Sequence, residues 1–386
     1  MPLDLLKFLT YGADLTAITG CFYLVIATRF VVRFVTASPR VSPGDRPVTV
    51  LRPLHGLDPG LHENLQSCVD QRYPVFELVC GVQDPADPAI VIVDQLKRER
   101  PDPVITLVID ATSHGRNFKV ANLVNMLRAA RHDCLVMIDS DMRTPPEFLA
   151  TVSGLLADPT AGLVTSLYRG RAADEGLWSR LGAQYINYAF LPQAVVGERL
   201  RPGRGCFGAS IAMSRETLEA MGGLAAIADT LADDNALGVG VRSLGKRVVV
   251  SPIILDNWLA EPSFGALFRH ELRWLLTIRS VAPRGHFGLL LTHPLPLALF
   301  GVLTGGLAPI PLGVLAIALL ARFGMVRAID RVLGLAPSGP WLFAGRDLIS
   351  FTVYVASFCT RTVTWRDRHF HVSRQGRLSA DGDRPP

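Results

Sequence analysis

CLVMIDSDMRTPPEF, residues 134–148, is the stretch that decides the fold class of this chain. An apolar run ends directly in Asp139, Ser140 and Asp141, and two prolines then open a helix. A short, continuous apolar run predicts a strand that helices cover on both faces. Because ligands of such sheets bind beyond the carboxyl ends of the strands, the stretch predicts two carboxylates at a ligand-binding edge.

Similar short apolar runs come before this strand. VTVLRP, ELVCGV and VITLVI alternate with helix-like stretches near 61–70, 88–99 and 119–131. This alternation predicts an α/β fold with a largely parallel sheet between about 47 and 255.

The Asp139 and Asp141 pair suits a divalent metal ion. Mg²⁺ and Mn²⁺ prefer oxygen ligands and bridge to substrate phosphates. A metal ion there would neutralise the charge that builds on a leaving nucleoside diphosphate. The alternative for two aspartates at a strand end is a solvated turn or a helix cap. The hydrophobic strand and its α/β context favour the metal site.

Two further motifs supply candidate nucleotide contacts. GVQDPADPAI follows a strand, and its Asp84 can accept hydrogen bonds from a base or a ribose. Capping of the helix near Pro88 is the alternative for Asp84 and for Asp87. RNFKVANLVN puts Lys119 at the start of an amphipathic helix, where it can contact a phosphate or a base. An ordinary solvated lysine is the alternative there.

Asp233 and Asp234 open a helix in DTLADDNALGVGVRSLGKRV. One acid can simply favour the positive helix terminus. The other is a candidate general base that takes a proton from an attacking hydroxyl.

SFGALFRHELRWLLTIRS places His270 and Arg273 on one helix face, with Trp274 next to them. Arginine can grip a diphosphate bidentately, and tryptophan can stack on a sugar or pack at a membrane interface. An amphipathic helix surface is the alternative for all three side chains.

Composition indicates several membrane segments. Of the 386 residues, 49% are hydrophobic and only 19% are charged. The net charge of +5 is mild and comes mostly from arginine, which favours phosphates and anionic lipid headgroups over nucleic acid as partners. The six cysteines are widely spaced, which predicts buried, reduced thiols and a catalytic part that faces the cytosol.

Three apolar regions are candidates for the membrane segments: about 15–35, about 287–322 and about 347–360. The first region predicts a retained membrane anchor, with an interfacial helix as the alternative. Arginines around its end predict that the following segment lies on the cytoplasmic side: Arg29, Arg33, Arg40, Arg46 and Arg52. The second region allows two spans hinged near Pro309 and Pro311. Three C-terminal spans would put the basic tail WRDRHFHVSR outside, against the positive-inside tendency, so one stretch could instead lie flat or re-enter.

These features divide the chain into four parts. We expect an N-terminal membrane anchor over 1–40, a catalytic domain over 41–285, C-terminal membrane segments over 286–365 and a basic tail over 366–386. The stretch 177–196 could lead a lipid headgroup from the membrane into the cleft, or could equally be a helix packed in the core.

Taken in order, VQDPADPA, NFKVANL, IDSDMR, ADDNALG and HELRW resemble glycosyltransferase family 21, a family 2-like group. This family contains the ceramide glucosyltransferases and bacterial hopanoid-biosynthesis relatives, and the chain looks closest to the latter. The likeness covers roughly 45–285 and the flanking membrane segments. It implies a GT-A fold, that of nucleotide-diphospho-sugar transferases. It also implies an inverting transfer of one sugar from UDP-GlcNAc or UDP-glucose to a lipid hydroxyl.

The resemblance also implies roles for individual residues. Asp84 would be the nucleotide-contacting acid, Asp139 and Asp141 the metal and diphosphate carboxylates, and Asp234 the base. Arg273 and Trp274 match the family's final Arg-Trp pair. His270 stands where the family usually has Gln or Arg. The form of the motif with this histidine resembles that of the bacterial hopanoid relatives.

We therefore expect a multi-pass protein, in a bacterial inner membrane, with a cytoplasmic catalytic domain that needs Mg²⁺ or Mn²⁺. Its acceptor would be a hopanoid or a ceramide-like lipid. A processive polysaccharide synthase is one alternative, although the few C-terminal spans argue against a translocation channel. A non-catalytic membrane scaffold is another, and the intact carboxylates argue against it.

Overall fold

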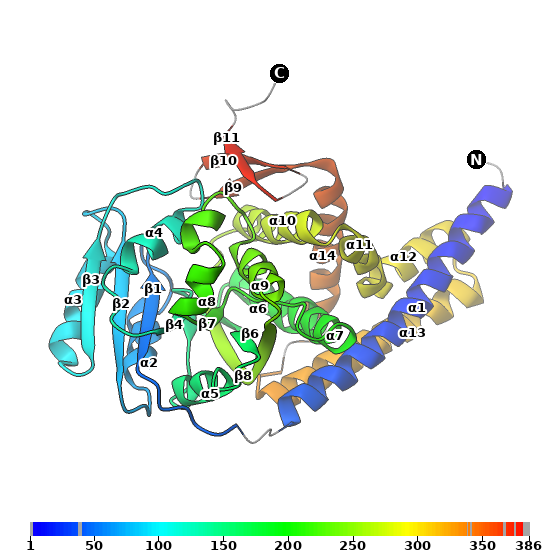
Figure 1. Ribbon diagram of the computed structural model, residues 1–386. Helices are drawn as coiled ribbons and strands as arrows, with labels where there is room; N and C mark the ends of the chain where they lie inside the picture. Colours follow the sequence, from blue (N-terminus) through cyan, green and yellow to red (C-terminus); the bar gives the residue numbers. More distant parts are fainter. Residues whose placement is uncertain are drawn as a thin grey trace.

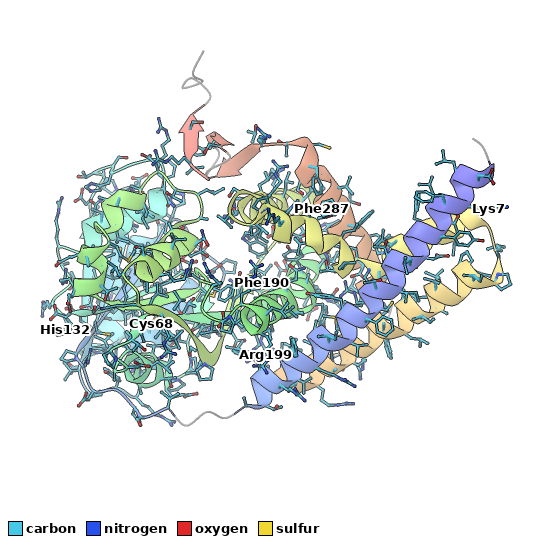
Figure 2. All side chains as sticks on the ribbon, turned by 45° about the vertical axis from the view of Figure 1, so that its right-hand side comes forward. Lys7, Cys68, His132, Phe190, Arg199 and Phe287 are labelled. Atoms are coloured by element: carbon cyan, nitrogen blue, oxygen red, sulfur yellow. The ribbon has the colours of Figure 1, made fainter. Side chains whose placement is uncertain are left out.

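The computed structural model describes residues 3–37, 41–337, 339, 342–365, 368–373 and 376–380. An α/β body carries a bundle of long helices on one side, and a small separate sheet lies near the C-terminus (Figure 1). Figure 2 shows Lys7 at the end of the first helix that lies farthest from this body.

The main sheet has eight strands in the order β3-β2-β1-β4-β7-β6-β8-β5. Its first four strands pair in parallel: β1 (Val48–Pro53), β2 (Phe76–Val82), β3 (Val104–Ile109) and β4 (Cys134–Ile138). The other four are β5 (Met142–Arg143), β6 (Ala161–Ala172), β7 (Ser210–Ser214) and β8 (Arg247–Leu259). Of these, β7 runs antiparallel to both β4 and β6, so the expected parallel sheet is confirmed for the first half and the second half is mixed.

Helices cover both faces of this sheet. The helices of the body are α2 (Leu61–Val69), α3 (Ala89–Glu99), α4 (Phe118–Met126), α5 (Phe148–Leu155), α6 (Leu177–Tyr185), α7 (Leu191–Leu200), α8 (Arg215–Ala220), α9 (Asp233–Ser243) and α10 (Phe264–Val281). A short 3-10 turn, η2 (Leu224–Ile227), comes before α9. Val50 of β1 packs with α2, α3 and α5, while its neighbour Leu51 packs with α4 and α9. Burial on both faces explains why each strand is a continuous apolar run.

The stretch 177–196 belongs to the packed interior. α6 continues through one π-helical turn, η1 (Ile186–Phe190), into α7. Asn187 accepts a hydrogen bond from the Gly170 amide and donates one to the Gly170 carbonyl. Leu191 is fully buried. The stretch is therefore a core-packed helix, as the second of the two interpretations held.

Three helices are long and apolar enough to cross a membrane: α1 (Leu3–Thr36), α13 (Pro309–Leu333) and α14 (Leu342–Cys359). A fourth candidate combines α11 (Pro283–Gly288) and η3 (Leu289–Thr292) with α12 (Pro294–Gly305), bent by 64°. The chain turns between α12 and α13 at Gly306, whose φ of 68° favours glycine. Pro309 and Pro311 lie in the first turn of α13 and do not bend it.

α1 and α13 run side by side in the same direction. Ala17 and Cys21 pack with Val314 and Ala318 near one end. Val31 packs near Ile329 at the other end, beside the α/β body. The basic residues toward the body end of the two helices are Arg29, Arg33, Arg327 and Arg331.

The chain after α14 is folded. A three-stranded antiparallel sheet consists of β9 (Thr362–Trp365), β10 (Arg368–Val372) and β11 (Leu378–Ala380). The segment 366–386, expected to be a basic tail, thus contains β10 and β11, and its last six positions lie outside the described residues.

Candidate active site

A cleft of about 400 Å³ lies beyond the carboxyl ends of β1 and β4. The loop after β1, the start of α4, the end of β4, the start of α9 and the middle of α10 all contribute to it. It brings together six of the predicted site residues: Lys119, Asp139, Asp141, Asp234, Arg273 and Trp274.

A larger hollow of about 770 Å³ lies at the opposite edge of the sheet, next to the start of β4. Two of its basic side chains already have partners. Arg215 lies 3.8 Å from Asp133, and Lys246 donates to the Thr217 hydroxyl at 2.9 Å. The chemistry that the motifs predict is at the smaller cleft.

Asp139, Ser140 and Asp141 form a turn that buried polar groups hold in place. Arg52 of β1 is fully buried and donates hydrogen bonds to the carbonyls of Ser140 at 3.0 Å and Met142 at 3.1 Å. Asn257 of β8 donates to Oδ2 of Asp141 at 2.7 Å. Arg52 therefore supports the site and is not the membrane-flanking charge that its position in the sequence predicted. Arg40, another of those arginines, lies outside the described residues.

The Asp141 carboxylate has the chemistry of a cation ligand. Its Oδ1 is buried and has no hydrogen-bond partner in the described part of the chain. Burial, together with the charges of Asp139 and Asp58, raises the pKa of Asp141 to about 7. Uncompensated negative charge of this kind fits a bound Mg²⁺ or Mn²⁺.

The described residues hold no group of three or more His, Cys, Asp or Glu side chains with metal-site geometry. A metal ion at Asp139 and Asp141 would therefore take its other ligands from phosphate and water, as Mg²⁺ usually does.

Asp58 is a site residue that the sequence did not reveal. It lies in the loop between β1 and α2, and the Ser140 hydroxyl donates a hydrogen bond to it. Burial is the main cause of a raised pKa at Asp58. Gly56 and Gly60 flank it with φ of 67° and 66°, conformations that favour glycine and let the loop turn back over β4. These two glycines after a strand were the only available signal.

Lys119 lies between two groups of acids. Its Nζ is 2.5 Å from Oδ1 of Asp139 and 3.5 Å from Oδ2 of Asp233. Burial lowers the pKa of Lys119, but these two acids and Asp234 outweigh it and raise the pKa well above its usual range. Lys119 is thus a fully charged, partly shielded cation inside the cleft.

Asp233 and Asp234 form the first turn of α9, as predicted. The amide of Asn235 donates to Oδ1 of Asp234 at 2.7 Å. Burial, followed by repulsion from Asp233, raises the pKa of Asp234 to about 7, although Lys119 opposes the shift. A carboxylate with a pKa near neutrality is well suited to general base catalysis.

Arg273 faces the same cleft from α10. Within the described residues, no carboxylate lies within ion-pair distance of its guanidinium. Burial lowers the pKa of Arg273, and the charges of Asp139, Asp141 and Asp233 partly offset that effect. Arg273 can therefore bind an anion without first leaving a protein partner.

Trp274 and His270 complete the wall that α10 presents. The Trp274 ring stacks on Tyr185 of α6, with centroids 5.6 Å apart, and lies 4.3 Å from the His270 ring. The Nδ1 of His270 is 2.7 Å from Oε1 of Glu261, which fixes the orientation of the imidazole.

Asp84 is the predicted residue that does not line the cleft. It lies exposed at the carboxyl end of β2, and its Oδ1 accepts the Ala86 amide at 2.8 Å. Asp87 is buried and accepts hydrogen bonds from the amides of Gly56 and Ala89, which is the capping interpretation.

A sheet that gathers acids, a lysine and an arginine beyond its parallel strand ends, beside membrane-type helices, belongs to a glycosyltransferase of the GT-A fold. The chain is a member of glycosyl transferase family 21, whose profile matches residues 12–378. The family predicted from the five motifs is thereby confirmed, and the hopanoid branch stays a prediction.

Similar proteins agree with this assignment. Ceramide glucosyltransferase 1 of Caenorhabditis elegans is 23% identical over 95% of this chain and 82% of its own length. The ceramide glucosyltransferase of Komagataella phaffii is 34% identical over 34% of this chain and 25% of its own length. Among solved structures, the mannosyltransferase PcManGT from Pyrobaculum calidifontis, in complex with GDP-Man and Mn²⁺, matches with a TM-score of 0.55. That match is at 20% identity over 90% of this chain and 99% of the other. The GT-A fold is thus confirmed.

Proposed function

We propose that this glycosyltransferase moves one sugar from a UDP-sugar, UDP-GlcNAc or UDP-glucose, to a membrane-lipid hydroxyl, with inversion at the anomeric carbon. The observation that carries the proposal is the shared cleft of Asp139, Asp141 and Asp234. This cleft combines an acidic cation site with a separate carboxylate, Asp234, whose pKa is raised to about 7.

The donor would bind across the carboxyl ends of β1 and β4. Asp139 and Asp141 would hold Mg²⁺ or Mn²⁺, which supplies charge neutralisation for the departing diphosphate. Arg273 and Lys119 would bind the phosphate oxygens. Asp84, at the outer end of β2, would contact the base or the ribose.

Asp234 would accept the proton of the acceptor hydroxyl. The acceptor oxygen then forms a bond to the anomeric carbon from the face opposite the diphosphate, and the bond from that carbon to the phosphate oxygen breaks. One displacement of this kind inverts the configuration. The proton ends on Asp234 and the electron pair leaves with UDP.

The acceptor would be a lipid, because the cleft belongs to a body that carries membrane-type helices. Relatives named ceramide glucosyltransferases support a ceramide-like or a hopanoid hydroxyl. Arg29, Arg33, Arg327 and Arg331, near the body end of α1 and α13, favour a cytoplasmic catalytic domain. The expected location is a bacterial inner membrane.

UDP release from purified protein, with and without candidate lipids, tests this function. One UDP per glycolipid formed is the expected result. Polymer formation would indicate a processive synthase, and the absence of lipid-dependent release would indicate a scaffold. Lipid mass spectrometry of a deletion strain would then identify the acceptor.

A further inference from the structure

The C-terminal sheet joins the loop that leads into α9. The Leu231 amide donates to the Gly376 carbonyl at 3.0 Å, and the Leu378 amide donates to the Asp229 carbonyl at 2.9 Å. Thr230 and Arg377 form an antiparallel bridge between these bonds. The segment 376–378 is therefore paired, through its backbone, with a loop that ends two residues before Asp233.

Behind this pairing lies a small apolar cluster. Phe370 of β10 and Leu378 of β11 are 5% and 2% exposed and pack with Leu231 and Leu276, against which Phe118 and Leu272 also lie. The Phe118 and Phe370 rings meet edge to face, with centroids 6.3 Å apart.

Three partners in the cluster lie within three residues of a charged cleft residue in the sequence. Phe118 precedes Lys119, Leu231 stands three residues before Asp234, and Leu272 precedes Arg273. The three motifs come from separate parts of the chain. Phe370 and Leu378 are the residues of the C-terminal sheet in the cluster that contains residues of all three segments.

We propose that Phe370 and Leu378 are positioning residues of the transfer site, and that α14 therefore stays on the catalytic side of the membrane. The role at the site rests on the function proposed above. The placement of α14 does not.

Both ends of α14 are tied to α10, the helix that carries Arg273 and Trp274. Near its start, Arg346 forms a two-bond ion pair with Glu271, at 2.7 and 2.6 Å. At its end, Arg279 donates to the carbonyls of Ser357 and Thr360. α14 is thus tied to a helix of the catalytic body at two points, near its start and at its end.

The burial pattern of α14 agrees with this placement. The buried side chains recur at helical spacing and include Arg346, Asp347 and Ser350. The exposed positions form one narrow stripe: Gly345, Leu348, Thr352, Val355, Phe358 and Cys359. This pattern fits a helix that packs on the catalytic body with its exposed stripe toward lipid. If α14 does not cross the membrane, the basic C-terminal segment lies on the same side as Arg29 and Arg33. The conflict between three C-terminal spans and the positive-inside tendency is then removed.

Cysteine labelling tests the placement of α14 without using activity. In a Cys359→Ser background, Arg377→Cys, Arg128→Cys of the catalytic body and Lys7→Cys at the far end of α1 are treated with a membrane-impermeant maleimide. Inverted and right-side-out vesicles are compared. We expect positions 377 and 128 to label in the same vesicles and position 7 in the opposite ones. Labelling of 377 and 128 from opposite sides would overturn the proposal.

Truncation of the cluster tests positioning. Phe370→Ala and Leu378→Ala should lower kcat by about 10-fold to 100-fold per folded molecule, because small misplacements of reacting groups are costly. The KM for the UDP-sugar should rise as well, because Phe118 and Leu272 of the cluster adjoin Lys119 and Arg273, the proposed phosphate contacts. Leu378→Met should restore most of kcat.

Leu96→Ala, on the core face of α3 and far from the cleft, is the matched control. It should destabilise the fold and leave kcat per folded molecule unchanged. Hydrogen exchange at residues 229–231 should rise in Leu378→Ala and stay unchanged in Leu96→Ala. Wild-type protein inactive with every UDP-sugar would refute the proposed function alone, whereas unchanged exchange at 229–231 would refute the positioning role.

Discussion

The ammonium group of Lys119 lies 2.5 Å from Oδ1 of Asp139, one of the two carboxylates proposed to hold the metal ion. Asp233 lies on its other side at 3.5 Å. A protein cation and a divalent ion thus compete for the same negative charge. Binding of a nucleotide diphosphate would give Lys119 another partner and release Asp139 for the metal ion.

Replacing Lys119 with Gln should separate metal binding from nucleotide binding. Removal of the competing charge should tighten Mn²⁺ binding without nucleotide by about 10-fold, equal to about 1.4 kcal/mol. The KM for the UDP-sugar should rise, because a phosphate contact is lost. Isothermal titration with MnCl₂ measures the first effect. Lys97→Gln, on α3, is the control, and weaker Mn²⁺ binding in Lys119→Gln would contradict the competition.

Replacing Asp234 with Asn should abolish the base and keep its shape. We expect transfer to fall by about 10²-fold to 10⁴-fold, the usual contribution of a general base. UDP-sugar binding should be nearly unchanged, since Asp139, Asp141 and Arg273 are intact. Asp94→Asn, on α3 and away from the cleft, should keep full activity. An Asp234→Asn enzyme that retains most turnover would assign the base elsewhere.

The pH dependence follows from the raised pKa of Asp234. The group must be deprotonated to act, so kcat/KM should increase with pH up to about 7 and then level off. Because Lys119 lowers the pKa of Asp234, Lys119→Gln should move this limb to higher pH. An acid limb near pH 4 in the wild-type enzyme would contradict the burial of the base.

The raised pKa of Asp234 also affects the free energy of unfolding. The pH dependence has the opposite sign to that of a carboxylate whose pKa is lowered by folding. A folded-state pKa above the ordinary 3.8 means that the folded protein binds more protons than the unfolded chain between those values. The contribution of Asp234 to stability is therefore complete below about pH 4 and lost as the pH rises through about 7. Thermal unfolding of wild type and Asp234→Asn across this range should show a smaller loss in the variant, in which Asp141, whose pKa is also raised to about 7, still contributes.

Breaking the ion pair between Arg346 and Glu271 should be severe, because both side chains are buried. Arg346→Ala leaves an unpaired buried carboxylate and should cost about 3 to 5 kcal/mol of unfolding free energy. The double variant Arg346→Met with Glu271→Leu should recover most of that loss. Denaturant unfolding in detergent measures both.

The exposed pair of Arg247 and Asp158 offers a matched control. Arg247→Ala should change the unfolding free energy by less than about 1 kcal/mol, because water screens exposed pairs. If Arg247→Ala and Arg346→Ala lowered the unfolding free energy by similar amounts, burial of the pair of Arg346 and Glu271 would not add to the cost of breaking it.

The first half of the sheet and the acidic turn could be read from the sequence because their signals are local. An apolar run such as residues 134–138 predicts a covered strand, and Asp139 follows it directly. Asp233 and Asp234 were equally visible at a helix start. A side chain directly at the end of a strand or helix can be located once that strand or helix is predicted.

Arg52 and Asp58 could not be placed in the same way. Arg52 stands in an apolar strand, where its charge suggested a membrane-flanking position, and only the tertiary contact with the Ser140 and Met142 carbonyls explains it. Asp58 lies in a loop whose path depends on two glycines in left-handed conformations. The C-terminal strands are short and basic. β9, β10 and β11 pair with one another, and the segment 376–378 also pairs with the distant loop at 229–231.

The packing of α1 also constrains the order in which parts of the protein can fold during synthesis. α1 leaves the ribosome first, but the residues that cover Ala17 and Cys21 belong to α12 and α13, about 280 to 300 positions later. Gly20 leaves room for the Leu291 carbonyl, which a Cβ would meet at 2.7 Å, so this face stays open until that part of the chain has been made. α1 thus remains without its helix partners while most of the α/β body is synthesised, and the bundle closes only after α12 and α13 have followed.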